Sequence, residues 1–191
     1  MPIAALLPQF LSDFVPLEVL LFGGVMLVII VLIHGAGLDR IVNRYKRKAD
    51  RLRAKRRHPH LATYIFAGAI LLMLLLHVTE SVLWGAVLYK VGLINNLRDS
   101  MYFSANTYTT IGYGFNILPQ SWRELAPIMA ISGLFTFAWT TGEMFGIVGQ
   151  QRELVAELSQ QRRTKTKTKS GHRADSPTGG VQQPGEKADN G

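Results

Sequence analysis

Three long apolar runs constrain this chain more than any other feature of its sequence. They cover residues 16–36, residues 61–78 with an amphipathic continuation to 90, and residues 126–149. A helix of about 20 apolar residues is about 30 Å long and crosses one bilayer. Lys and Arg are segregated from these runs, because 10 of the 21 lie in 40–57 and 8 more in 152–187. A soluble domain interleaves apolar and charged residues along its sequence. The segregation seen here therefore predicts an all-α integral membrane protein with three transmembrane helices.

The positions of the basic residues predict the orientation of these spans. Short loops rich in Lys and Arg stay on the cytoplasmic side, which places residues 38–60 and the tail after 149 inside the cell. The N-terminus and residues 90–123 are then outside, and we expect a multi-pass protein of the cell (inner) membrane. A cleaved signal peptide is the alternative for the first run. Residues 1–15 carry no Lys or Arg, however, and the apolar stretch is longer than a typical signal-peptide core.

A further segment, residues 97–109, is too short to cross a bilayer as a helix. It lies between the second and third runs and has the length of a re-entrant half-helix. We expect Asn96 or Asp99 to cap its N-terminus. Its negative C-terminal dipole end would point at the membrane centre and stabilise a cation there.

The chain therefore divides into a membrane module with a helix before it and a tail after it. We expect the linker to be a polar loop, and the tail to be helical in composition through about 163 and disordered beyond. The expected segments are an external N-terminus (1–15), an additional transmembrane helix (16–37), a basic cytoplasmic linker (38–60), a pore domain (61–149) and a cytoplasmic tail (150–191).

The half-helix is followed by Thr110-Ile111-Gly112-Tyr113-Gly114. Potassium crosses a membrane when backbone carbonyls replace its hydration shell, and loops of the pattern T-V-G-Y-G supply these carbonyls. Aiming successive carbonyls at one axis requires backbone conformations that disfavour a Cβ, which explains the two glycines. Thr110 can add its hydroxyl at the inner end, Ile111 can pack behind the loop and Tyr113 can brace it. The sequence thus predicts a selectivity filter that binds potassium at 110–114.

A single strand of carbonyls cannot surround an ion. Non-helical backbone at membrane depth is tolerated only where protein buries it or it lines a water-filled cavity. The chain has one such motif and no internal repeat. We therefore expect a homotetramer with four-fold symmetry.

Residues 77–149 resemble the pore module of potassium channels, specifically the small bacterial proteins of the ion-channel-two family. The resemblance is carried by Tyr102-Phe103-Ser104, Thr107, Thr109 to Gly114, and Gly133-Leu134-Phe135. It implies a potassium-channel pore fold with an outer helix at 61–89, a pore helix at 97–109, the filter at 110–114 and an inner helix at 126–149.

The resemblance also implies roles on the inner helix. Gly133 falls where such channels often carry a hinge glycine. A stripe at spacing four, formed by Phe137, Thr141 and Phe145, lines the inner vestibule or packs against neighbouring helices. Two positions depart from the family. Phe115 and Asn116 follow the filter where Asp is usual, and Asn106 stands where many relatives have Glu or an apolar residue.

Three ionisable residues within the spans are candidates for function. His77 and Glu80 lie three residues apart on one helix face. We expect a hydrogen-bonded bracket near the pore helix, with a metal site or a pH-sensing role of His77 as alternatives. Glu143 forms a ring of four carboxylates near the inner mouth or pairs with a basic linker residue. His34 and Glu18 are interpreted as residues near span ends, and Trp139 as packing.

The basic residues of 40–57 have three interpretations. Voltage sensing requires arginines at regular spacing within a membrane helix, and nucleic-acid binding usually adds interleaved aromatic residues. We expect instead that they determine topology and attract anionic lipids, with no nucleic acid as partner.

The sequence thus predicts a potassium-selective channel subunit that transports potassium passively. The alternatives are a weakly selective cation channel, and a non-conducting membrane anchor or regulatory subunit. The chain contains no cysteine, and no nucleophile–base–acid constellation or phosphate loop is visible. We therefore expect no enzyme, no cofactor and no metal beyond the permeant potassium.

Overall fold

The computed structural model describes residues 16–55, 59–113 and 118–174, with side chains described through Thr164. These residues form four α-helices and one 3₁₀ turn, and no strand occurs among them. In chain order the elements are α2 (Leu17–Ala54), α3 (Pro59–Lys90), α4 (Leu97–Tyr108), η1 (Gln120–Trp122) and α5 (Leu125–Ala174).

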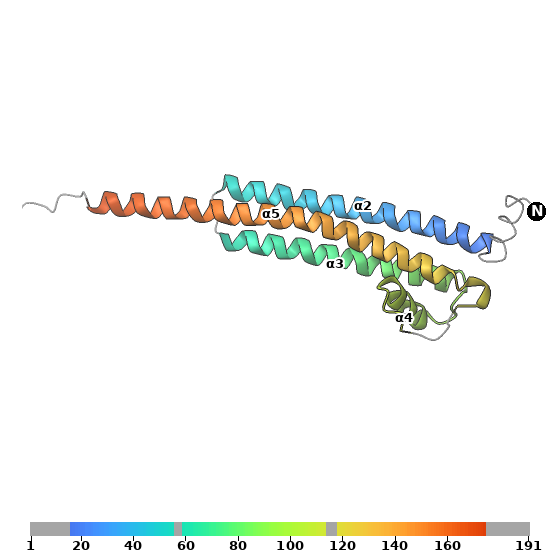
Figure 1. Cartoon of the computed structure of the whole chain (residues 1–191). Coiled ribbons are helices and arrows are strands. Elements are labelled where there is room, and N and C mark those ends of the chain that lie inside the picture. Colours follow the sequence, from blue (N-terminus) through green and yellow to red (C-terminus); the bar gives the residue numbers. More distant parts are fainter. Residues whose placement is uncertain (1–15, 56–58, 114–117, 175–191) are drawn as a thin grey trace, which may run out of the picture.

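The three long helices α2, α3 and α5 lie side by side, and the short α4 lies at one end of the bundle (Figure 1). α4 packs against α3 and α5. Within the described residues, three helices are long and apolar enough to cross a membrane. The predicted all-α membrane architecture with three spans is therefore confirmed.

The first span is longer than the sequence predicted. α2 has 38 residues, about 57 Å, and continues through the basic segment to Ala54. The expectation of a polar loop over 38–60 is therefore wrong for most of that segment. The physical reason is a seam of buried residues at spacings of three and four, which is uninterrupted in the basic half at Leu38, Val42, Tyr45, Ala49 and Leu52.

The last helix also continues beyond its apolar run. α5 extends without a break to Ala174, so the expected disorder after about 163 is wrong as far as that residue. Leu154 and Leu158 pack with Ala49, Leu52 and Ala62 at the end of the bundle remote from α4. The Nε of Arg53 donates to Oε2 of Glu157 at 2.9 Å on the same side. Residues 175–191 of the expected tail lie outside the described residues.

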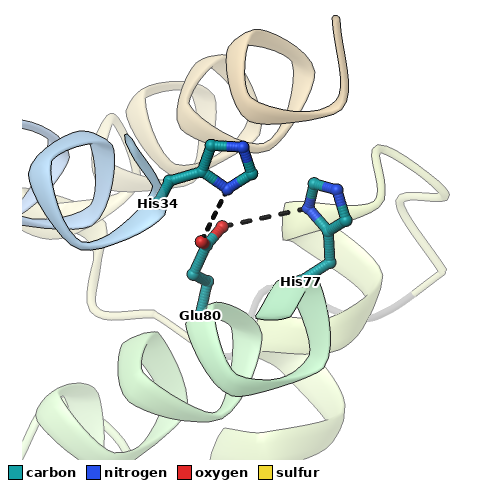
Figure 2. Close-up of side chains that lie close together, drawn as sticks. All are labelled: His34, His77 and Glu80. Atoms are coloured by element: carbon teal, nitrogen blue, oxygen red, sulfur yellow. Dashed lines mark hydrogen bonds and ion pairs between the residues drawn. The ribbon is translucent and has the colours of Figure 1, made fainter. Parts of the chain in front are cut away.

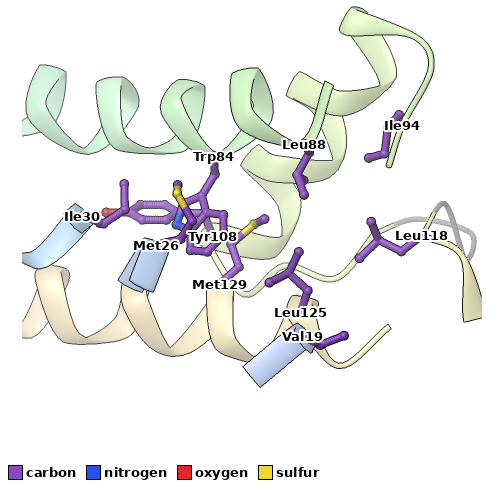
Figure 3. Packing of buried hydrophobic residues seen from close by; sticks show 10 residues of the cluster. All are labelled: Val19, Met26, Ile30, Trp84, Leu88, Ile94, Tyr108, Leu118, Leu125 and Met129. Carbon is purple, nitrogen blue, oxygen red and sulfur yellow. The ribbon is translucent and has the colours of Figure 1, made fainter. Parts of the chain in front are cut away.

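The largest buried cluster lies at the α4 end of the bundle (Figure 3). Trp84 of α3 and Tyr108 of α4 are at most 1% exposed, and Met129 of α5 is fully buried beside them. The indole Nε1 of Trp84 donates to Oγ of Ser132 at 3.1 Å, which satisfies its only polar atom. This cluster joins all four helices, because Met26 and Ile30 of α2 also belong to it.

α4 is held between α3 and α5 by backbone contacts at small residues. On the α3 side, Ser100 and Ser104 donate to the carbonyl oxygens of Gly85 and Ser81. On the α5 side, a Cβ added to Gly133 would lie 2.0 Å from the carbonyl oxygen of Tyr108. Gly133 is thus required for this close approach, whereas its role as a hinge stays a prediction.

Replacing Gly133 by Ala should therefore displace the C-terminal end of α4. The methyl group would overlap a backbone carbonyl that cannot rotate away, and we expect the free energy of unfolding to fall by roughly 2 kcal/mol. Thermal unfolding of the purified protein in detergent, followed by circular dichroism, measures the effect. Gly24→Ala on α2 is the control, because no atom lies within 4 Å of its Cβ position. Equal melting of the two variants would contradict the contact.

Candidate functional site

α4 begins and ends as the sequence requires for a half-helix. Asn96 is the N-cap, and its side-chain oxygen accepts from the backbone N–H of Arg98 at 2.9 Å. Of the two expected caps, Asn96 is therefore the correct one. The helix has 12 residues and ends at Tyr108, after which Thr109 closes the last turn. The chain then leaves helical geometry at Thr110.

The loop after α4 has an alternating backbone. Thr110 has φ 60° and Gly112 has φ 70°, whereas Ile111 and Tyr113 between and after them do not have positive φ. Thr110 is the one residue other than glycine with positive φ in the described chain. Such a conformation costs a residue with a Cβ about 1 to 2 kcal/mol and persists only where its surroundings impose it. Gly114 and its successors through 117 lie outside the described residues.

Hydrogen bonds to the last turn of α4 impose this conformation. The backbone N–H of Thr110 donates to Thr107 O at 3.0 Å. Those of Ile111 and Gly112 both donate to Asn106 O, at 2.9 and 3.2 Å. Because the N–H groups point back to the helix, the loop carbonyls are free to face elsewhere.

Asn106 therefore supports the loop through its backbone. Its side chain does not reach the loop, because Nδ2 donates to Tyr102 O one turn back in the same helix at 2.8 Å. The side chain of Asn106 therefore does not brace the loop, and the support at this position comes from the main chain. The second departure, at Phe115 and Asn116, lies outside the described residues.

His77 and Glu80 lie buried against the C-terminal end of α4. The Tyr108 hydroxyl donates to Glu80 Oε2 at 2.5 Å and lies 3.1 Å from His77 Nδ1. The same phenol oxygen is 2.7 Å from Thr136 Oγ1 of α5. The expected bracket near the pore helix is therefore present, and its partner on α4 is Tyr108.

His34 is a member of this cluster that sequence reasoning missed. It was expected near a span end, but it is fully buried in the middle of α2 and its Nδ1 lies 2.8 Å from Glu80 Oε1 (Figure 2). Its Nε2 is 3.1 Å from Thr140 Oγ1. The signal that could have found it is its position four residues after Ile30 in the buried seam, since an ionisable residue within an apolar span normally has a partner.

The cluster has the composition of a metal site. One nitrogen each from His34 and His77 and one carboxylate oxygen from Glu80 lie within 4.8 Å of one another. Two imidazoles and a carboxylate are ligands that zinc accepts. The same atoms are, however, already engaged in hydrogen bonds with tyrosine and threonine hydroxyls.

The predicted stripe on α5 divides into two parts. Phe137 stacks on the His77 ring with 4.0 Å between centroids and thus packs against α3. Thr141 and Phe145 point away from the described bundle, and Phe145 is 74% exposed. Glu143 is also exposed and forms no ion pair with a basic residue among those described. The expected pairing of Glu143 with the linker is therefore not found in the described chain.

Comparison with known proteins identifies part of this arrangement. A family model described as an ion channel matches residues 61–150, which include α3, α4, the loop and the apolar part of α5. The match covers 90 of the 191 residues of the chain. No curated protein and no solved structure matches the chain.

Tyr108→Phe tests whether the bracket supports α4. The variant keeps the ring but removes the hydroxyl that contacts Glu80, His77 and Thr136. Leaving buried polar atoms without a partner should lower the free energy of unfolding by roughly 2 kcal/mol. Thermal unfolding in detergent measures this, and Tyr102→Phe is the control, since that side chain is 57% exposed on the same helix. If both variants melt like the wild type, the phenol hydroxyl of Tyr108 carries no support.

Proposed function

We propose that this chain is a subunit of a potassium-selective channel that conducts passively through a homotetrameric pore. The match of residues 61–150 to an ion channel family model supports an ion channel. The step to potassium rests on the loop at Thr110 to Tyr113, because its backbone alternates while its N–H groups are held by α4. Dehydrated potassium is coordinated by carbonyls from such loops.

The filter of the proposal comprises Thr110, Ile111, Gly112, Tyr113 and Gly114. Gly114 is included on the sequence pattern alone. Within one chain, Ile111 is 58% exposed and Tyr113 is 74% exposed. Non-helical backbone and its side chains at membrane depth must be covered by protein. Neighbouring subunits would supply that cover, which supports the proposed four-fold assembly.

The inner helix would contribute the rest of the pore. Thr141 and Phe145 are exposed on α5 in the single chain and are our candidates for the vestibule wall. Glu143 between them has no partner among the described residues, so four copies could form a ring that attracts cations. Phe137 is the weaker candidate because it stacks on His77.

We propose the bacterial cell (inner) membrane as the location, with the N-terminus outside and the C-terminus in the cytoplasm. Basic residues in α2 beyond its apolar half support this orientation. The same residues support contact with anionic lipids. Arg44 and Lys48 line a shallow cavity with apolar Ile65 and Leu72 of α3, where a headgroup and the start of an acyl chain could both be accommodated.

Two other functions remain distinguishable by experiment. A weakly selective cation channel would give a reversal potential near zero in opposed potassium and sodium solutions, whereas a selective one follows the potassium gradient. A non-conducting anchor would show no potassium flux at all. The family consists of channels, which move ions without covalent chemistry, and we propose no catalytic activity.

Potassium flux from proteoliposomes tests the filter directly. Gly112→Ala should abolish flux, because its φ of 70° strains any residue with a Cβ and shifts the carbonyls. Gly92→Ala is a matched control, since Gly92 also has positive φ, 78°, and open space around its Cβ position, but lies in the turn after α3. We expect that variant to keep its flux. Equal flux from both variants and the wild type would reject the filter assignment.

Glu143→Gln tests the inner ring. Removing four carboxylates should lower single-channel conductance at low ionic strength and change it little at high ionic strength, where salt screens their field. Planar-bilayer recordings at two salt concentrations measure the difference. Glu153→Gln on the same helix is the control, because Glu153 is also exposed but lies outside the apolar run. Unchanged conductance and rectification in Glu143→Gln would exclude the ring.

A further inference from the structure

Five buried side chains from four helices form a closed ring of hydrogen-bond contacts. In order around the ring they are Glu80, His34, Thr140, His77 and Tyr108. The distances are 2.8 Å from Glu80 Oε1 to His34 Nδ1, 3.1 Å from His34 Nε2 to Thr140 Oγ1, 3.1 Å from Thr140 Oγ1 to His77 Nε2, 3.1 Å from His77 Nδ1 to the Tyr108 hydroxyl, and 2.5 Å from that hydroxyl to Glu80 Oε2. We call this set the five-residue ring.

The five-residue ring is also buried from water. None of its members is more than 7% exposed, and His34 and Glu80 are fully buried. Among the described residues, no nitrogen or oxygen of the ring lacks a partner. Buried polar atoms depend on such contacts, and each contact requires one hydrogen between its two heavy atoms.

Counting those hydrogens fixes the protonation of the ring. Tyr108 and Thr140 supply one each, and each neutral imidazole supplies one, which makes four hydrogens for the five contacts. With Glu80 ionised, one contact would join two acceptors and repel. A fifth proton, on Glu80 or shared with His34, completes the ring.

With five protons every contact has a donor and an acceptor in one direction around the ring. Tyr108 donates to Glu80 Oε2, Glu80 Oε1–H donates to His34 Nδ1, and His34 Nε2–H donates to Thr140. Thr140 then donates to His77 Nε2, and His77 Nδ1–H donates to the Tyr108 oxygen. That oxygen has a second lone pair for the nearby Thr136 hydroxyl.

The electrical charge of the ring also favours five protons over four. With five protons the ring is electrically neutral, whereas with four it carries one negative charge inside a membrane helix bundle, where an unpaired charge is costly. Within the described residues, the titratable groups that face the ring are its own members on α2, α3 and α4. α5 faces it with Thr136 and Thr140 and offers no cation.

We propose that the five-residue ring is a proton-binding site that retains its fifth proton at neutral pH. The proton joins α2 to the last residue of α4, because the chain of contacts from His34 through Glu80 to Tyr108 depends on it. Tyr108 lies two residues before Thr110. Loss of the proton at alkaline pH would therefore loosen the support of the loop.

A zinc site built on the same side chains would have different contacts from the proton-bound ring. A zinc ion bound by both imidazoles and Glu80 would occupy lone pairs with which these side chains accept hydrogen bonds in the ring. The proton leaves every one of these contacts intact. We therefore assign the five-residue ring as a site for a proton and not for zinc.

Solid-state NMR of the full chain in liposomes, labelled with ¹³C-glutamate and ¹⁵N-histidine, counts the protons directly. At about pH 8, free glutamate is ionised and free histidine is neutral. We expect one signal of a protonated carboxyl or a doubly protonated imidazole in the wild type. Ionised carboxylates and neutral imidazoles throughout would overturn the proposal. So would one equivalent of bound Zn²⁺ that Glu80→Gln abolishes.

Glu80→Gln is also the matched variant for stability. An amide donates to His34 and accepts from Tyr108, so it completes the ring without a titratable proton. We expect it to lose the NMR signal and melt close to the wild type, whereas Glu80→Ala melts lower. If Glu80→Gln melts as low as Glu80→Ala, the ring does not require the fifth proton.

A flux measurement adds a readout that rests on the proposed function. Potassium flux of the wild type should fall at alkaline pH, because loss of the proton loosens the support of the loop, and flux of Glu80→Gln should fall less. The same change in both would place the titration outside Glu80 and overturn its role. Absence of flux in every variant would reject the proposed channel function and leave the proton count by NMR unaffected.

Discussion

The carbonyl oxygen of Tyr108 lies 2.0 Å from the place where residue 133 would carry its Cβ, so α4 and α5 touch backbone to backbone. Side chains can rotate away from a crowded site, whereas a helix backbone cannot, and the contact therefore fixes the end of α4. The loop with alternating φ begins only two residues later and takes its hydrogen bonds from the last turn of α4. The contact at Gly133 thus positions the residue from which the loop starts.

Polar contacts around α4 support the loop in a chain that has no carboxylate at position 106. The family usually braces the filter with carboxylates behind it, but Asn106 stands at one such position and bonds back to its own helix. Here the support comes from the Asn106 carbonyl and from the Tyr108 hydroxyl, which contacts side chains of both α3 and α5. In a region without water each such bond has few competitors, so a small number of them can hold a loop that is itself strained.

Much of this arrangement could be predicted from the sequence, because its signals are local. Long apolar runs identify spans, and a glycine pattern after a short helix identifies the loop. The continuation of α2 was missed because charge density hid the regular spacing of Leu38, Val42 and Tyr45. The bond between His34 and Glu80 was missed for a different reason. It joins residues 46 positions apart, and no local pattern records which faces of two helices meet.

The continuity of α2 changes what the first span can do. One rigid helix carries both His34, beside the end of α4, and Arg53, which pairs with Glu157 at the remote end of the bundle. The helix is continuous between these residues and its buried seam is regular, so we expect its two ends to move together. Any rotation or sliding of α2 must therefore alter the contact between His34 and Glu80. Since Glu80 also accepts from Tyr108, such a movement reaches the residue from which the loop starts.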